Sequence, residues 1–196
     1  MGTLYDWAAA APGRHEYQGR GPVYAVAAGG ERIVVRRVRH GGMLAPITGD
    51  LFTGSTRAPH ELDVSLRLLA GGVRTPAVLA YAVYPAGVAG LLRRVDVVTR
   101  EISSGLDLAR AIQAGPESTE RIWGAVTELL ASLTRVGAVH PDLNARNIII
   151  AGSGADTPVA WVIDVDRIHF AHPGDPSVAA ANRRRLERSA AKLGLQ

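Results

Sequence analysis

A short polar loop between two apolar runs constrains this chain more than any other stretch. It covers residues 139–150 and reads Val-His-Pro-Asp-Leu-Asn-Ala-Arg-Asn-Ile-Ile-Ile. Asp142 and Asn147 lie five residues apart in it. Burying Asp and Asn side chains costs free energy unless they are hydrogen-bonded or used by a ligand. The surrounding fold must therefore hold this loop in place.

The longest amphipathic pattern of the chain leads directly into the loop. Between residues 119 and 136, apolar residues recur at helical spacing: Ile122, Val126, Leu129, Leu133 and Val136. Ser118 or Thr119 is expected to cap the start of this helix, and Gly137 is expected to end it. The pattern therefore predicts a helix that delivers the chain to the loop.

A second acidic element follows the loop. Residues 148–150 and 159–163 read as the two strands of a hairpin, which places Asp164 at a strand end. Asp166 follows two residues later and either binds a metal or pairs with Arg167. The loop and this element together predict a polar site beside the hairpin.

The order of the polar residues matches a known chemistry. A His-x-Asp sequence followed by Asn five positions after the Asp is typical of the catalytic loop of protein-kinase-like phosphotransferases. Asp142 is thus the candidate base or hydroxyl-orienting residue, with His140 supporting the catalytic loop by hydrogen bonds. Asn147 and Asp164 are the candidate ligands of Mg²⁺, which prefers hard oxygen donors. Taken singly, an Asp or an Asn in a loop more often caps a turn, but the ordered set of four favours a phosphoryl-transfer site.

The positive charge expected near nucleotide phosphates has an unusual candidate. The only lysine of the chain is Lys192, so a lysine on an early strand is excluded. Arg36 ends a predicted strand and takes that place, with Glu61 near the start of the next predicted helix as its partner. The alternative is that Arg36 is a surface residue at a strand end.

Three further residues are assigned to the nucleotide site. Gly19 and Gly21 flank Arg20, and a glycine-rich turn lets backbone amides approach phosphates. Glu101 lies in the polar stretch that is expected to link the two parts of the chain. The cofactors that this site implies are ATP and Mg²⁺.

The remaining patterns predict antiparallel strands. Residues 23–26 and 33–35 flank a Gly pair and indicate a hairpin. Residues 75–92 are uncharged for long enough to raise the question of a membrane span, but their Pro and Gly residues favour two strands around a turn. Residues 59–70 read as a helix, and residues 41–56 as a long loop.

These elements predict an α+β fold with the two lobes of a protein kinase. Residues 1–18 are expected to be a loosely held N-terminal leader. Residues 19–102 are expected to form a small lobe with an antiparallel sheet and a helix. Residues 103–196 are expected to form a reduced, mainly helical lobe that carries the catalytic loop and ends in a basic helix.

Composition narrows the class of protein. Apolar residues make up 47% of the chain and charged residues 20%, which is typical of a globular protein. The absence of cysteine excludes disulfides and thiolate metal sites. The net charge of +4 comes almost wholly from arginine, which suits acidic ligands, nucleic acid or an anionic membrane. A GC-rich genome explains this bias equally well, and the lack of aromatics among the basic residues disfavours nucleic acid.

The motifs resemble those of the lipopolysaccharide kinase family, and within it the enzymes that act on 3-deoxy-D-manno-octulosonic acid (Kdo). The resemblance rests on residues 140–148 and 163–167 and on shorter matches at residues 19–21, 35–36, 39–42 and 52–54. Near the end of the chain it rests on Asn182, Arg185, Leu186, Arg188, Ser189 and Lys192. Val165 departs from the Phe that the family usually has between its two aspartates.

The resemblance implies an ATP-dependent phosphotransferase that acts on a Kdo hydroxyl of a lipid A precursor. It also implies a location in the cytoplasm of a Gram-negative bacterium, peripheral on the inner membrane. We expect a monomer with no nucleic-acid partner. Two alternatives stay open. One is a kinase for another small sugar, an aminoglycoside-like compound or a protein hydroxyl, and the other is a nucleotide-binding pseudokinase scaffold.

Overall fold

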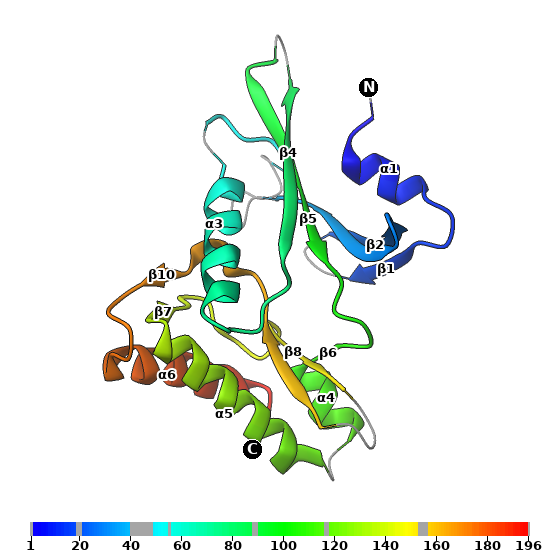
Figure 1. Ribbon diagram of the computed structural model, residues 1–196. Helices are drawn as coiled ribbons and strands as arrows, with labels where there is room; N and C mark the ends of the chain where they lie inside the picture. Colours follow the sequence, from blue (N-terminus) through cyan, green and yellow to red (C-terminus); the bar gives the residue numbers. More distant parts are fainter. Residues whose placement is uncertain are drawn as a thin grey trace. The chain divides into compact units, whose positions relative to one another are not determined.

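The chain forms two compact units. A computed structural model describes residues 2–18, 21–39, 49–54, 56–87, 90–115, 118–152 and 157–195 (Figure 1). The first unit comprises residues 1–62 and 77–101, and the second comprises residues 63–76 and 102–196. The expected α+β class is confirmed.

The first unit is built on a five-stranded antiparallel sheet with the strand order β1-β2-β3-β5-β4. Its strands are β1 (His15–Gln18), β2 (Pro22–Ala28), β3 (Glu31–Arg37), β4 (Val78–Ala86) and β5 (Leu92–Arg100). The predicted hairpin is β2–β3, and Gly29 and Gly30 turn it with positive φ angles of 59° and 82°. The uncharged residues 75–92 contain one strand, β4, and its partner β5 begins only at Leu92, so the expectation of two strands within this stretch is wrong. Within the described residues, no helix has the length and apolar character needed to cross a membrane.

The N-terminal segment packs on this sheet. Helix α1 (Leu4–Ala10) begins with a capping box between Thr3 and Asp6. Tyr5 and Ala8 of α1 are buried with residues of β2, β3 and β5, and the Tyr5 amide donates a hydrogen bond to Asp96 (2.9 Å). Strand β1 then pairs with β2. The expectation of a loosely held leader is therefore wrong, because apolar burial and sheet pairing hold these residues.

Among its described residues, the second unit combines helices with two small sheets. The helices α4 (Leu108–Ala114), α5 (Thr119–Arg135) and α6 (Pro176–Lys192) belong to it. One sheet joins β6 (Leu106–Asp107), β8 (Ile148–Ala151) and β9 (Val159–Val162), and the other joins β7 (Ala138–Val139) and β10 (His169–Phe170). The predicted hairpin after the loop is β8–β9.

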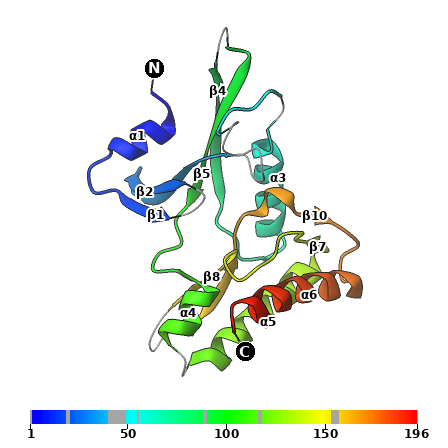
Figure 2. The same ribbon diagram turned by 180° about the vertical axis from the view of Figure 1, so that it is seen from behind.

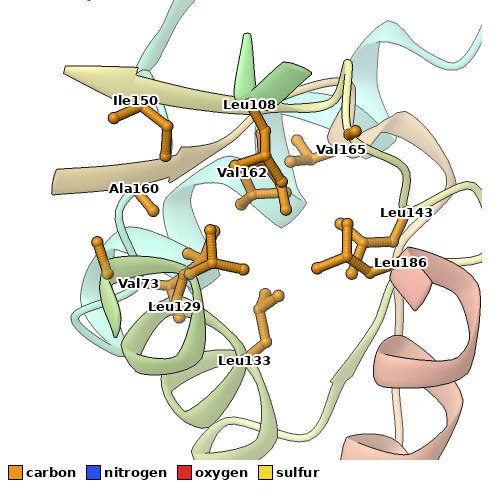
Figure 3. Close-up of a cluster of buried hydrophobic side chains, with 14 of the residues drawn as sticks. Val73, Leu108, Leu129, Leu133, Leu143, Ile150, Ala160, Val162, Val165 and Leu186 are labelled. Atoms are coloured by element: carbon orange, nitrogen blue, oxygen red, sulfur yellow. The ribbon is translucent and has the colours of Figure 1, made fainter. Parts of the chain in front are cut away.

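The core of the second unit lies between these elements. Leu129 and Leu133 of α5 pack with Val162 of β9 and Leu186 of α6 (Figure 3). Helices α5 and α6 lie side by side in both views (Figures 1 and 2). Helix α3 (Ala58–Ala70) also contributes to this core. Residues 63–76 therefore group with the second unit, although we expected residues 19–102 to form one lobe.

The two ends of α5 can be compared with the predicted cap at Ser118 and the predicted end at Gly137. Ser118 occupies the cap position but makes no capping bond, since its hydroxyl accepts a hydrogen bond from Arg121 (3.0 Å). Gly137 ends the helix with a φ of +74°. A Cβ atom at this position would lie 2.4 Å from the Ala171 carbonyl oxygen. Only glycine fits where the chain turns into the loop.

Candidate active site

His140 anchors the loop from a fully buried position. Its amide donates to Asn182 Oδ1 (3.0 Å), and its Nδ1 accepts a hydrogen bond from the Asp142 amide (3.3 Å). Burial lowers the pKa of the imidazole, so the ring is neutral near pH 7. Because Nδ1 is an acceptor, the proton lies on Nε2, which donates to the Ile163 carbonyl (3.3 Å). His140 thus joins the loop to the acidic element, as its supporting role predicts.

Three side chains of α6 hold the loop from the other side. Asn182 Nδ2 donates to the Ala138 carbonyl (2.9 Å), in addition to accepting from His140. Arg185 Nε donates to the Pro141 carbonyl (2.7 Å), and Ser189 Oγ accepts from the Ala145 amide (3.1 Å). We call these three residues the α6 clamp.

The sequence contained a pattern that could have predicted the α6 clamp, although the role of these residues was not recognised. Asn182, Arg185 and Ser189 were only family matches, yet their spacing of three and then four residues places them on one face of a helix. A polar stripe at this spacing on a helix with a buried face needs hydrogen-bond partners. Here the partners are backbone amide and carbonyl groups of the loop. The hydrogen bonds within the loop's own turns leave these groups without a partner, so the α6 side chains satisfy them.

The loop positions the carboxylate of Asp142 with its two oxygens in different environments. Asn144 and Asn147 both donate to the Asp142 backbone carbonyl, at 2.7 and 3.0 Å. Oδ2 of Asp142 accepts a hydrogen bond from Arg167 Nη1 (2.5 Å). Arg167 thus pairs with Asp142, whereas one of our expectations paired it with Asp166. No hydrogen bond reaches Oδ1 in the described part of the chain. The side chain is 40% exposed, so the carboxylate is accessible from solvent.

Asn147 and Asp164 lie at the same end of paired strands. Ile148 pairs with Val162, and the Ile163 amide donates to the Asn147 carbonyl (3.0 Å). Asp164 adopts a left-handed backbone with φ 61° and ψ 48°, an unusual conformation for a residue other than glycine. Such backbone strain is often retained where a side chain must be aimed.

The donor set at this end fits a magnesium ion. Asn147 uses Nδ2 toward Asp142, so its Oδ1 is the remaining donor, and the Asp164 carboxylate makes no bond to another described residue. The charges of Asp164, Asp142 and Asp166 each raise the pKa of His140 against the effect of burial, which indicates that all three carboxylates lie near the ring. No group of three His, Cys, Asp or Glu able to hold a metal occurs among the described residues. Mg²⁺ commonly takes one or two protein ligands and completes its shell with water and phosphate.

The predicted ion pair of the first unit is present. Arg36 Nη2 bonds to both carboxylate oxygens of Glu61, with 2.5 Å to Oε2. Glu61 is 5% exposed, whereas the Arg36 side chain is 27% exposed. Arg36 therefore has the carboxylate partner that we expected, and its assignment to the cofactor site stays a prediction.

What the structure shows differs for the three other residues that we assigned to the nucleotide site, Gly19, Gly21 and Glu101. Gly19 lies outside the described residues. At Gly21 a Cβ atom would lie 2.6 Å from the Arg39 guanidinium carbon, so this glycine makes room for that side chain. The Glu101 carboxylate accepts from the Tyr17 hydroxyl (2.7 Å) and pairs with Arg32. Burial raises the pKa of Glu101, but the bonds from Arg32 and Tyr17 outweigh it and hold the pKa below its ordinary value. This side chain fixes the end of the sheet, and its assignment to the cofactor site stays a prediction.

Comparisons with known proteins agree with this geometry. The profile of the "Lipopolysaccharide kinase (Kdo/WaaP) family" matches residues 7–196. The chain is 30% identical over 179 residues to 3-deoxy-D-manno-octulosonic acid kinase of Photobacterium profundum, a match that covers 89% of this chain and 72% of that protein. For the enzyme of the same name from Xylella fastidiosa (strain M12), identity is 29% over 155 residues. That match covers 76% of this chain but 58% of the relative.

Solved structures give the fold. The structure of WaaP in complex with acyl carrier protein superposes with a TM-score of 0.61 at 20% identity, covering 99% of this chain and 77% of the other. The Rio2 kinase of Chaetomium thermophilum, solved with ADP/Mg²⁺ and phosphoaspartate, gives 0.60 at 16% identity over 91% of this chain and 54% of its own. The expected protein-kinase-like fold is therefore confirmed.

Proposed function

Because this chain belongs to the lipopolysaccharide kinase (Kdo/WaaP) family, we propose that it is an ATP-dependent sugar kinase that phosphorylates a Kdo hydroxyl on a lipid A precursor. The observation that carries this proposal is the carboxylate of Asp142. One of its oxygens is held by Arg167, and the carboxylate is accessible from solvent.

Asp142 orients the acceptor. Its Oδ1 accepts a hydrogen bond from the sugar hydroxyl and takes up the proton as the hydroxyl oxygen bonds to the γ-phosphorus. The bond between the γ-phosphorus and the β–γ bridging oxygen breaks, and ADP leaves. His140 and the α6 clamp keep the loop backbone still during this step, because they satisfy its amide and carbonyl groups.

Asn147 and Asp164 would hold Mg²⁺ through Oδ1 and the carboxylate. When bound with ATP, the ion neutralises charge on the β- and γ-phosphates. The chain's own part is to fix these two ligands, which it does through the β8–β9 pairing and the Asn147–Asp142 bond. Replacing Asp164 by Asn is expected to raise the Mg²⁺ concentration needed for half-maximal activity at least tenfold. An unchanged requirement would exclude Asp164 as a ligand.

Arg36 supports the proposal by supplying a phosphate-binding cation. The guanidinium is always charged and offers several N–H donors, of which Glu61 takes some. Its side chain is 27% exposed, so this permanent positive charge can attract phosphate from solution.

Transfer of labelled phosphate from ATP to a Kdo-containing lipid A precursor is the direct test. The acceptor panel adds an aminoglycoside and a protein substrate, because the catalytic loop alone does not select the acceptor. Phosphorylation of the Kdo lipid above the other acceptors is the expected result. Preference for another acceptor would move the reaction to the alternative kinase class. Mg²⁺-dependent ATP binding without transfer to any acceptor would identify a pseudokinase scaffold.

The exposed face of α6 is a candidate surface for binding the membrane that holds the lipid acceptor. Arg183, Arg184, Arg188 and Lys192 are exposed on it, and none of them makes an ion pair with another residue that the structure describes. Each basic residue near an anionic surface contributes about 1 kcal/mol. We therefore propose peripheral binding at the cytoplasmic face of the inner membrane.

Vesicle flotation tests this location. Anionic vesicles are expected to carry the protein, and changing Arg184 and Arg188 to Gln is expected to remove about 2 kcal/mol of the binding free energy. Equal flotation with neutral and anionic vesicles would exclude the electrostatic surface.

A further inference from the structure

Arg167 lies beside the catalytic carboxylate with most of its hydrogen-bonding capacity unused. Its Nη1 donates to Asp142 Oδ2, and its side chain is 50% exposed. A guanidinium has five N–H donors in a planar fork. Within the described ranges, Arg167 makes no other side-chain hydrogen bond or ion pair. Its remaining donors are therefore left for solvent or for a ligand that binds beside the Asp142 carboxylate.

The position of Arg167 is set by the backbone that carries it. Residues Val165–Arg167 form a 3-10 turn that starts at the left-handed Asp164. Val165 and Ile168, which flank Asp166 and Arg167, are buried, and the Ile168 amide donates to the Val165 carbonyl (3.0 Å). Packing at both ends thus fixes where the arginine emerges, independently of its bond to Asp142.

We propose that Arg167 is a specificity-determining residue that binds the carboxylate of an acidic sugar while Asp142 orients the hydroxyl of the same sugar. This inference rests on the proposed function, because Kdo is a sugar acid and carries a carboxylate beside its hydroxyl groups. A guanidinium matches a carboxylate with two parallel hydrogen bonds, which a neutral sugar does not offer.

The ion pair with Asp142 makes the two events compatible. Nη1 remains on Oδ2, so Oδ1 is left for the hydroxyl, while the other donors of Arg167 take the sugar carboxylate. The hydroxyl and the carboxylate must then lie about one sugar ring apart. A neutral hexose places no anion there and leaves the guanidinium donors without a partner.

The test compares two acceptors that differ in one charge. They are the methyl glycoside of Kdo and its carboxamide, which keeps every hydroxyl but is neutral. The wild-type protein is expected to favour the acid in kcat/KM by about 10- to 100-fold, the range of a charge-assisted hydrogen bond. In Arg167→Gln this preference is expected to fall to about one, mainly through a higher KM for the acid. Arg167→Lys is expected to keep part of it.

Arg110→Gln is the matched control. Arg110 is an exposed arginine of α4, and its change is expected to leave the acid preference intact. Thermal unfolding of each variant shows whether it is folded, and Arg167→Lys serves if the glutamine variant is not.

The outcomes separate the inference from the proposed function. If Arg167→Gln lowers kcat/KM equally for the acid and the amide, Arg167 only positions Asp142 and the inference is overturned. A wild-type protein that phosphorylates both acceptors equally well overturns it too. If the wild type phosphorylates neither glycoside, the inference is overturned, while the assay with the Kdo-containing lipid decides the proposed function separately.

Discussion

Removing the carboxamide of Asn182 tests how the loop is held. This side chain is fully buried and makes two hydrogen bonds, one accepted from the His140 amide and one donated to the Ala138 carbonyl. Asn182→Ala leaves both backbone groups buried without a partner, and each costs about 1–3 kcal/mol. We therefore expect the free energy of unfolding to fall by about 4 kcal/mol, a large share of the ~5–15 kcal/mol of a typical domain.

Urea unfolding measures this loss, with an unchanged m-value showing that only stability has changed. Asn182→Asp is the informative companion, because it keeps the acceptor for His140 but loses the donor for Ala138. Arg184→Ala, two residues further along α6 and exposed, is the control and should change stability by less than about 0.5 kcal/mol. A loss below about 1 kcal/mol for Asn182→Ala would refute the idea that α6 holds the loop.

Three further perturbations test other parts of the structure. Gly137→Ala should destabilise the protein by at least about 2 kcal/mol in urea unfolding, because of the positive φ and the contact with Ala171. In contrast, Gly124→Ala in the exposed interior of α5 should stabilise it by about 0.5–1 kcal/mol, and equal effects would contradict this reasoning. Arg36→Ala breaks a partly buried ion pair and should cost about 3 kcal/mol in urea unfolding. It should also weaken Mg-ATP binding in calorimetry at least tenfold, with Glu61→Gln as comparison, and unchanged ATP affinity would contradict the phosphate role. Glu101 has a pKa below its ordinary 4.5, so its stabilising effect is full above pH 4.5 and is lost as the pH falls through the folded-state pKa. Thermal melting between pH 7 and 3 should therefore fall less steeply in Glu101→Gln than in the wild type, and parallel curves would exclude this linkage.

Local sequence patterns predicted the elements that carry the site. The five-residue spacing of Asp142 and Asn147, the apolar stripe of α5 and the glycine pair of the β2–β3 hairpin each specify a structure within a few residues. The Arg36–Glu61 pair was also predictable, because a kinase-like order of strand and helix requires a cation and a carboxylate at these places.

Contacts between distant residues were not predictable in the same way. One of the two expectations for Asp166 was a pair with Arg167, yet Arg167 pairs with Asp142, 25 residues earlier. With 22 basic and 18 acidic residues, spacing alone does not select the partner of one arginine. The prediction of a loosely held leader at residues 1–18 failed for another reason. The Thr3–Asp6 capping box was a usable signal for helix α1, but the burial of Tyr5 depends on a sheet that is completed about 90 residues later.

The central claim is that Asp142 orients the hydroxyl that receives the phosphoryl group. Its most direct test is the turnover of Asp142→Asn with saturating Mg-ATP and a Kdo-containing acceptor. This change keeps the shape of the side chain and the backbone bonds from Asn144 and Asn147. We predict that kcat falls about 100- to 10,000-fold while the affinity for Mg-ATP stays within about twofold. A variant that keeps near-normal kcat would contradict the claim.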